Sequence, residues 1–210
     1  MSKFLVVFDV DSTLIQDEVI ELLAEVAGKR AEVAEVTERA MRGELDFAQS
    51  LIERVNTLAG LPETVFEDVY HRITPTLGVQ ETIDAIQAAG GLVGAVSGGF
   101  TQVLTPLAAQ LGLNFARANQ LEVVDGKLTG KILGQIVDRA VKADSLKEWA
   151  ELSCIAMDRT VAVGDGANDL EMMRVAALGV AFNAKPIVRE QAQVVLGSHD
   201  LRDLLPLLGL

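Results

Sequence analysis

Three short polar segments of this sequence combine residue types that suit phosphoryl-transfer chemistry. In the first, Asp9-Val10-Asp11-Ser12-Thr13, two carboxylates are separated by one residue. Two carboxylates on the same side of a strand end can divide such a reaction between nucleophilic attack and proton transfer. An Asp-x-Asp pair also occurs as an ordinary loop or helix cap, so the surrounding sequence has to decide between the two interpretations.

The other two segments offer groups for binding an anion and a cation. Residues 97–99, Ser-Gly-Gly, have small side chains that let backbone N–H groups approach an anion, and the serine hydroxyl is a further donor. Residues 164–169 add the carboxylates of Asp165 and Asp169, which suit a hard cation bound through oxygen. Taken separately, the first segment is typical of an ordinary turn and the second of an acidic surface loop.

Each polar segment directly follows a short apolar run. Nearly continuous hydrophobicity is typical of strands buried on both faces, and it predicts strands over residues 4–8, 92–96, 160–163 and 178–182. Helical patterns alternate with these runs, over residues 79–89, 101–111, 141–152 and 168–176. This alternation predicts an α/β fold with a doubly wound, Rossmann-like parallel sheet. Ligands bind beyond the carboxyl ends of such strands, so we expect the three polar segments to meet.

Residues 17–74 interrupt the alternation and predict an inserted four-helix cap domain. The expected cap helices cover residues 18–27, 31–42, 47–58 and 63–73. Residues 1–16 and 75–210 then form the α/β core domain with the catalytic centre. Asp125-Gly126 lies between strand-like flanks, which predicts a small β-hairpin in this core.

Together with Lys142, the three segments resemble the four motifs of the haloacid dehalogenase superfamily of phosphatases, and the resemblance covers essentially the whole chain. Within the superfamily the likeness is closest to the members that hydrolyse O-phospho-L-serine, on the strength of Glu18, Arg54-Val55 and the Gly-Gly-Phe after Ser97. It implies a magnesium-dependent hydrolase for the last step of serine biosynthesis, an amino-acid biosynthetic pathway. The alternative is a phosphatase or phosphotransferase of the same superfamily that acts on another small phosphorylated metabolite.

The resemblance implies roles in catalysis and metal binding. Asp9 would be the nucleophile that forms an aspartyl-phosphate, and Asp11 would act first as acid and then as base. Magnesium would bind a carboxylate oxygen of Asp9, the backbone carbonyl of Asp11 and a carboxylate oxygen of Asp165. Waters would complete its shell, and Asp169 would orient one of them.

The resemblance also implies a phosphate site, made by Ser97, the Gly98 amide and Lys142 with support from Asn168. Thr13 lies in the turn whose hydroxyls and amides can hold phosphate oxygens. Lys142 taken alone is typical of a solvated surface residue. Its place between the second and third segments favours the functional interpretation.

Residues of the predicted cap would select the substrate. In the resembling family Glu18 binds the amino group of phosphoserine and Arg54 binds its carboxylate, a pairing that suits both ends of a zwitterion. Met41 and Phe47 would shield the site from water. For all four residues the alternative is a structural one: surface charge for Glu18 and Arg54, and core packing for Met41 and Phe47.

Composition narrows the class of protein further. The formal net charge of −12 over 210 residues argues against a nucleic-acid-binding surface, and no apolar stretch is long enough for a membrane span.

A single cysteine, Cys154, excludes an intramolecular disulfide and indicates a reducing cytoplasm; we expect it to be a small core residue. The chain begins one strand before Asp9, so we expect no amino-terminal regulatory domain. The oligomeric state stays open, and the intact motifs argue against a binding module without turnover.

Overall fold

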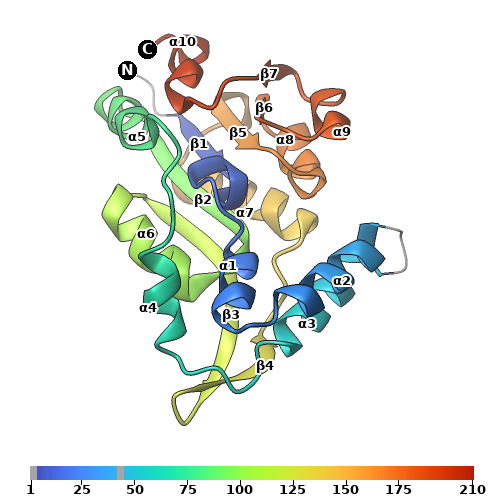
Figure 1. Ribbon diagram of the computed structural model, residues 1–210. Helices are drawn as coiled ribbons and strands as arrows, with labels where there is room; N and C mark the ends of the chain where they lie inside the picture. Colours follow the sequence, from blue (N-terminus) through green and yellow to red (C-terminus); the bar gives the residue numbers. More distant parts are fainter. Residues whose placement is uncertain (1–3, 42–44) are drawn as a thin grey trace.

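The computed structural model describes residues 4–41 and 45–210 of the chain (Figure 1). A seven-stranded sheet in the order β4-β3-β2-β1-β5-β6-β7 forms its centre. The strands are β1 (Leu5–Phe8), β2 (Leu92–Phe100), β3 (Phe115–Val124), β4 (Lys127–Leu133), β5 (Thr160–Gly164), β6 (Leu178–Phe182) and β7 (Val194–Leu196). Every neighbouring pair is parallel except the antiparallel pair β3–β4. The predicted α/β fold class is confirmed.

Helices cover both faces of the sheet, as expected for a doubly wound fold. They are α5 (Val79–Ala88), α6 (Thr101–Leu111), α7 (Arg139–Leu152), α8 (Leu170–Val175), α9 (Pro186–Arg189) and α10 (Leu205–Leu208). Side chains of β1 alternate between two cores because successive strand residues point to opposite faces. Phe8 packs in one core with Ile83 of α5 and Leu104 of α6. Val7 packs in the other with Leu146 of α7.

Helices also fill the segment between β1 and α5, as the sequence predicts. They are α1 (Val19–Val26), α2 (Arg30–Met41), α3 (Phe47–Asn56) and α4 (Val65–Tyr70). Three backbone hydrogen bonds of 2.8 Å join this segment to the β3–β4 hairpin: Gly60 donates to Leu128, Leu128 to Leu61, and Glu63 to Gly126. Helix α3 packs against β4 and α2 packs against α3, and in Figure 1 both helices lie away from the strands at the centre of the sheet.

The sequence expectations and the structure differ in several places. The predicted β-hairpin around Asp125-Gly126 is present as β3–β4, and the structure adds that β3 pairs with β2, so the hairpin extends the main sheet. Strand β7 is too short to be recognised from its sequence. The expectation that Cys154 is a core residue is wrong: it is exposed just after α7, with a φ of 54°. Arg42, the last residue of a predicted cap helix, lies outside the described residues. The division into core and cap domains stays a prediction. Within the described ranges, no helix has the length and apolarity that a membrane crossing requires.

Candidate active site

The turn Val10–Leu14 places two carboxylates beyond the end of β1. The N–H of Asp9 donates to the carbonyl of Val163 at 2.8 Å, so the pairing of β1 with β5 continues as far as Asp9. Asp11 is extended and Ser12 adopts φ 58°, in the left-handed region. That conformation costs a non-glycine residue about 1–2 kcal/mol, and the turn is closed by a hydrogen bond from the Ile15 N–H to the Val10 carbonyl at 3.1 Å. The side chains of Asp9 and Asp11 both line the same cavity.

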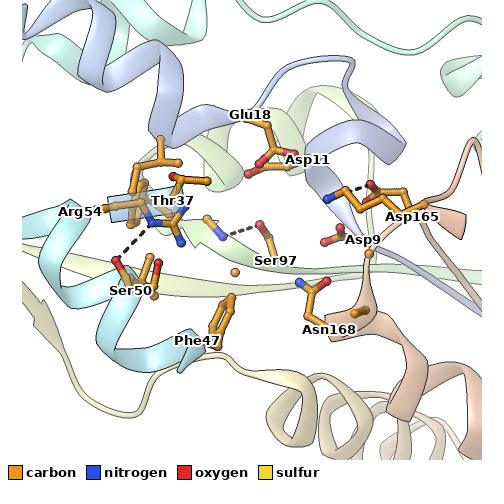
Figure 2. Close-up of a pocket in the computed structure, with 18 of the residues that line it drawn as sticks. Asp9, Asp11, Glu18, Thr37, Phe47, Ser50, Arg54, Ser97, Asp165 and Asn168 are labelled. Atoms are coloured by element: carbon orange, nitrogen blue, oxygen red, sulfur yellow. Dashed lines mark hydrogen bonds and ion pairs between the residues drawn. The ribbon is translucent and has the colours of Figure 1, made fainter. Parts of the chain in front are cut away.

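This cavity, of about 460 Å³, lies between the carboxyl ends of the strands and helices α1–α3. The predicted site residues that line it are Asp9, Asp11, Glu18, Phe47, Arg54, Ser97, Gly98, Asp165 and Asn168. Figure 2 shows Asp9, Asp165 and Asn168 at one end and Arg54 at the other, with Glu18, Asp11 and Ser97 between them. The three polar segments therefore meet, as the parallel topology predicts.

Three other predicted residues are fully buried and do not line the cavity: Thr13, Lys142 and Asp169. Among the residues that the structure describes, the Thr13 hydroxyl has no hydrogen-bond partner. Met41 is the last residue of α2, and its side chain lies outside the described part of the structure.

Lys142 lies beneath the cavity and joins two carboxylates. Its Nζ donates to Asp9 Oδ1 at 2.6 Å and to Asp169 Oδ1 at 2.7 Å. Burial by itself would lower the pKa of Lys142, but Asp169 and Asp9 together outweigh that effect and raise it. Asp138 caps α7 by accepting from the Val141 N–H at 2.9 Å, so the helix start that carries Lys142 is held in place.

The acids of the site are harder to ionise than ordinary aspartates. Burial raises the pKa of Asp9 to about 7, with a further increase from Asp169 that Lys142 only partly opposes. Burial likewise raises the pKa of Asp165 to about 6, although Lys185 acts in the opposite direction. Both shifts follow from removing negative charge from water and placing it near other negative charge.

Asp11 is set apart from the other acids by its contacts. Burial raises its pKa well above the usual range, and the charges of Glu18 and Asp9 raise it further. Its Oδ1 is buried and has no hydrogen-bond partner in the part of the chain that the structure describes. A carboxyl group in this setting favours the protonated form, which is the form that can donate a proton.

The end of the cavity that holds Asp9 and Asp165 has the residue composition of a cation site. Asp9, Asp165 and Asp169 are buried, and one carboxylate oxygen of each lies within 4.8 Å of the others. Oxygen donors are what a hard divalent cation prefers. Asp169 is already engaged through both oxygens, by Lys142 and by the Gly166 N–H at 3.0 Å. The donor set therefore fits a divalent metal ion.

The opposite end of the cavity is formed by α1 and α3. The Arg54 Nε donates to the Ser50 carbonyl at 3.2 Å. Burial lowers the pKa of Arg54, against the opposing charges of Glu18, Glu21 and Asp11. Glu18 accepts a hydrogen bond from the Ser12 hydroxyl at 2.9 Å. The Arg54 guanidinium thus faces the cavity at the end away from Asp9, and the Glu18 carboxylate lies between the two ends, beside Asp11.

Two residues of the site region were missed by sequence reasoning. Lys185 follows β6 and lines the cavity, and its Nζ lies 3.8 Å from Asp165 Oδ2. Its position after a predicted strand was a usable signal. Asn119 is buried in β3 and hydrogen-bonds to the Gly98 carbonyl. No local pattern in the sequence distinguishes it.

The fold and the acids at the strand ends together define a phosphatase-type hydrolase. The family profile of the haloacid dehalogenase-like hydrolases matches residues 6–174. The chain belongs to this family, which confirms the resemblance inferred from the motifs.

Several relatives within this family are named phosphoserine phosphatases. The chain is 52% identical over 206 residues to a phosphoserine phosphatase of Streptococcus thermophilus, which covers 98% of this chain and 96% of that protein. A solved phospho-aspartyl intermediate analogue of phosphoserine phosphatase superposes with a TM-score of 0.92 at 43% identity, covering 99% of both chains. A substrate-bound phosphoserine phosphatase complex gives 0.93, with the same identity and coverage.

Proposed function

We propose that this protein hydrolyses O-phospho-L-serine to L-serine and phosphate, through an aspartyl-phosphate on Asp9, in the cytoplasm and as the last step of serine biosynthesis. The observation that carries the proposal is the single cavity that joins the Asp9 centre to Glu18 and Arg54. A zwitterionic phosphomonoester would place its phosphate at the Asp9 centre and its ammonium and carboxylate groups near Glu18 and Arg54. The 52% identity to a phosphoserine phosphatase over nearly the full length supports the same substrate.

The first step is the transfer of the phosphoryl group to Asp9. A carboxylate oxygen of Asp9 attacks phosphorus, and the bond from phosphorus to the seryl oxygen breaks as the new bond forms. Asp11, whose buried surroundings favour its protonated form, gives its proton to the departing seryl oxygen. Serine leaves, and Asp11 is left as a carboxylate.

The second step releases phosphate and restores both acids. Asp11 accepts a proton from a water molecule whose oxygen attacks the phosphorus of the aspartyl-phosphate. The bond between phosphorus and the Asp9 oxygen breaks, so phosphate leaves and Asp9 returns as a carboxylate. One acid therefore serves as proton donor and then as proton acceptor.

We assign the metal site to a carboxylate oxygen of Asp9, the Asp11 carbonyl and a carboxylate oxygen of Asp165, with Mg²⁺ as the ion. When bound, Mg²⁺ would offset the negative charge of the phosphoryl group during transfer. Asp169 serves as a supporting residue, because Lys142 and the Gly166 N–H already occupy its oxygens.

The phosphoryl oxygens are bound by Ser97, the Gly98 amide and Lys142, with Asn168 and Thr13 in support. Lys142 lies 2.6 Å from Asp9, which places a permanent positive charge beside the nucleophile. This charge offsets that of the incoming phosphate on a strongly acidic protein.

Recognition of the amino acid belongs to the helices between β1 and α5, which we propose to be a cap domain of residues 17–74 on a core of residues 1–16 and 75–210. The Glu18 carboxylate binds the substrate ammonium, and the Arg54 guanidinium binds its carboxylate. Phe47 and Met41 exclude water during the reaction. The Phe47 side chain lines the cavity, which supports its part in this role.

A substrate panel tests the proposal. Purified protein with Mg²⁺ is given phosphoserine, phosphothreonine and an aryl phosphate, and released phosphate is measured with and without added acceptor alcohols. We expect the highest kcat/KM for phosphoserine and no transfer to the alcohols. Asp9→Asn should be folded and inactive. The proposal fails if phosphoserine is not hydrolysed while other monoesters are.

A further inference from the structure

A buried side chain outside the cavity lining connects the two phosphate-binding parts of the site. Asn119 lies in β3 and is 1% exposed. Its Nδ2 donates to the Gly98 carbonyl and its Oδ1 accepts from the Val137 N–H, each at 2.8 Å. Both functional ends of the amide are therefore occupied by backbone groups of two different segments.

The hydrogen bond from Asn119 to the Gly98 carbonyl takes the place of a backbone hydrogen bond that the pairing of β2 with β3 lacks at this point. The pairing of β2 with β3 runs in register up to Val96 and Arg117 and resumes only at Phe100 and Asn119, with a shift between them. Residues 97–99 thus leave the regular ladder at the point where they face the cavity. A buried carbonyl without a partner is costly, and Asn119 supplies the partner that β3 does not.

The same bond orients the hydroxyl of Ser97. Holding the Gly98 carbonyl also fixes the N–H on the other side of that peptide plane, which belongs to Gly99. This N–H donates to Ser97 Oγ at 2.7 Å, the contact drawn at Ser97 in Figure 2. Because Ser97 Oγ accepts here, its own proton is left for an acceptor in the cavity.

The second bond reaches the segment that carries Lys142. Val137 immediately precedes Asp138, the residue that caps α7. The Lys142 N–H donates to the Asp138 carbonyl at 2.9 Å, in the first turn of that helix. Asn119 therefore holds the start of α7 as well as the irregular part of β2 at Gly98.

We propose that Asn119 is a positioning residue for phosphoryl binding, a proposal that rests on the proposed function. Through its two hydrogen bonds, Asn119 sets the positions of the Ser97 hydroxyl and the Lys142 ammonium relative to each other. Its side chain does not line the cavity. A side chain that fixes two binding groups in this way matters because misplacing them by about 1 Å can cost on the order of 100-fold in rate.

The test compares Asn119→Ala with Thr160→Ala. Thr160 is also fully buried and also bonds two backbone groups, the Met157 carbonyl at 2.7 Å and the Ala177 N–H at 3.3 Å. It lies at the amino end of β5, opposite the site. Urea unfolding confirms that each variant is folded under the assay conditions.

Calorimetric titration with orthophosphate in the presence of Mg²⁺ is the main measurement. We expect the Kd for orthophosphate to rise about 10- to 100-fold in Asn119→Ala, with kcat/KM for phosphoserine lowered by a similar factor. The Kd for Mg²⁺ should stay within about twofold, since Asn119 touches none of the metal carboxylates. Thr160→Ala should match the wild type in all three measurements.

Asn119→Asp separates the two bonds and replaces the alanine variant if that fails to fold. An ionised carboxylate still accepts from Val137 but cannot donate to Gly98, so phosphate binding should remain impaired. The inference is overturned if orthophosphate affinity in the Asn119 variants equals that of Thr160→Ala, if Mg²⁺ affinity falls equally, or if the wild type binds no orthophosphate. A wild type that binds orthophosphate but does not hydrolyse phosphoserine contradicts only the proposed function.

Discussion

The ammonium of Lys142 lies 2.6 Å from the Asp9 carboxylate, with both groups buried and 133 residues apart in the chain. A buried ion pair of this kind is strongly interdependent, because removing one partner leaves the other charged and desolvated. The pair therefore links the stability of the fold to the chemistry of the site.

Lys142→Met should lower the free energy of unfolding by about 3–5 kcal/mol, because Asp9 and Asp169 lose their shared buried counter-ion. Phosphate release should fall by more than about 100-fold. Urea denaturation and steady-state kinetics measure the two effects. Lys147→Met is the control, since Lys147 is an exposed residue of the same helix that pairs with Asp144 at 3.0 Å; its change should be below about 1 kcal/mol. Equal effects of the two substitutions would contradict the prediction.

The pH dependence of stability should report the buried acids of the metal-free protein. The folded-state pKa of Asp9, about 7, lies above its ordinary value of 3.8, so the contribution of Asp9 to stability is complete below about pH 4 and is lost as pH rises through 7. The contribution of Asp165 to stability is likewise lost as the pH rises from about 4 to 6. Asp11 adds to this slope, because its pKa is raised too.

The measurement is urea unfolding in EDTA across pH 5 to 8. The free energy of unfolding should decrease through this range, and Asp9→Asn should flatten the decrease between pH 6 and 7. A slope in Asp9→Asn as steep as in the wild type would show that Asp9 is not the group that titrates there.

Mg²⁺ should stabilise the folded protein, since it replaces mutual repulsion between buried carboxylates with attraction. At 100 times its Kd a ligand specific to the folded state adds about 2.7 kcal/mol to the free energy of unfolding. Thermal unfolding with EDTA and with added Mg²⁺ gives the difference. Asp165→Asn should remove most of this gain and Asp158→Asn, on the exposed surface, should keep it. If Mg²⁺ stabilised Asp165→Asn as much as it stabilises the wild type, Asp165 would not be a ligand of the metal.

Glu18→Gln and Arg54→Gln should change which substrate is preferred. Loss of one partner of a hydrogen-bonded charge pair costs about 2–5 kcal/mol, so kcat/KM for phosphoserine should fall by on the order of 100-fold. An aryl phosphate has neither an ammonium nor a carboxylate and serves as the internal control, with kcat/KM changing by less than about threefold. If both substrates lose activity in parallel, these residues support the fold or the chemistry and do not select the amino acid.

Much of the fold was predictable because its signals are local. The runs from which β1, β2, β5 and β6 were predicted are nearly continuously apolar, the pattern that is typical of strands buried on both faces. Once the sheet is parallel, the polar residues that follow each run must lie at one edge. The meeting of Asp9, Ser97 and Asp165 in one site therefore follows from the sequence pattern.

Other features depended on contacts between distant segments. The place of β3 in the main sheet follows from its pairing with β2, and the exposure of Cys154 follows from how the chain leaves α7. Asn119 acquires its importance only because residues 97–99 leave the ladder beside it. None of these is encoded in a window of neighbouring residues.

The sequence by itself determined the residue types of the site and the strand ends that carry them, since both follow from local hydrophobicity and side-chain chemistry. Only the tertiary structure decided that Lys142 lies beneath Asp9 and Asp169, that Lys185 faces Asp165, and that Asn119 holds the irregular part of β2 at Gly98. Burial and the distances between charges set the pKa of each acid, and these quantities exist only when the folded chain brings distant residues together.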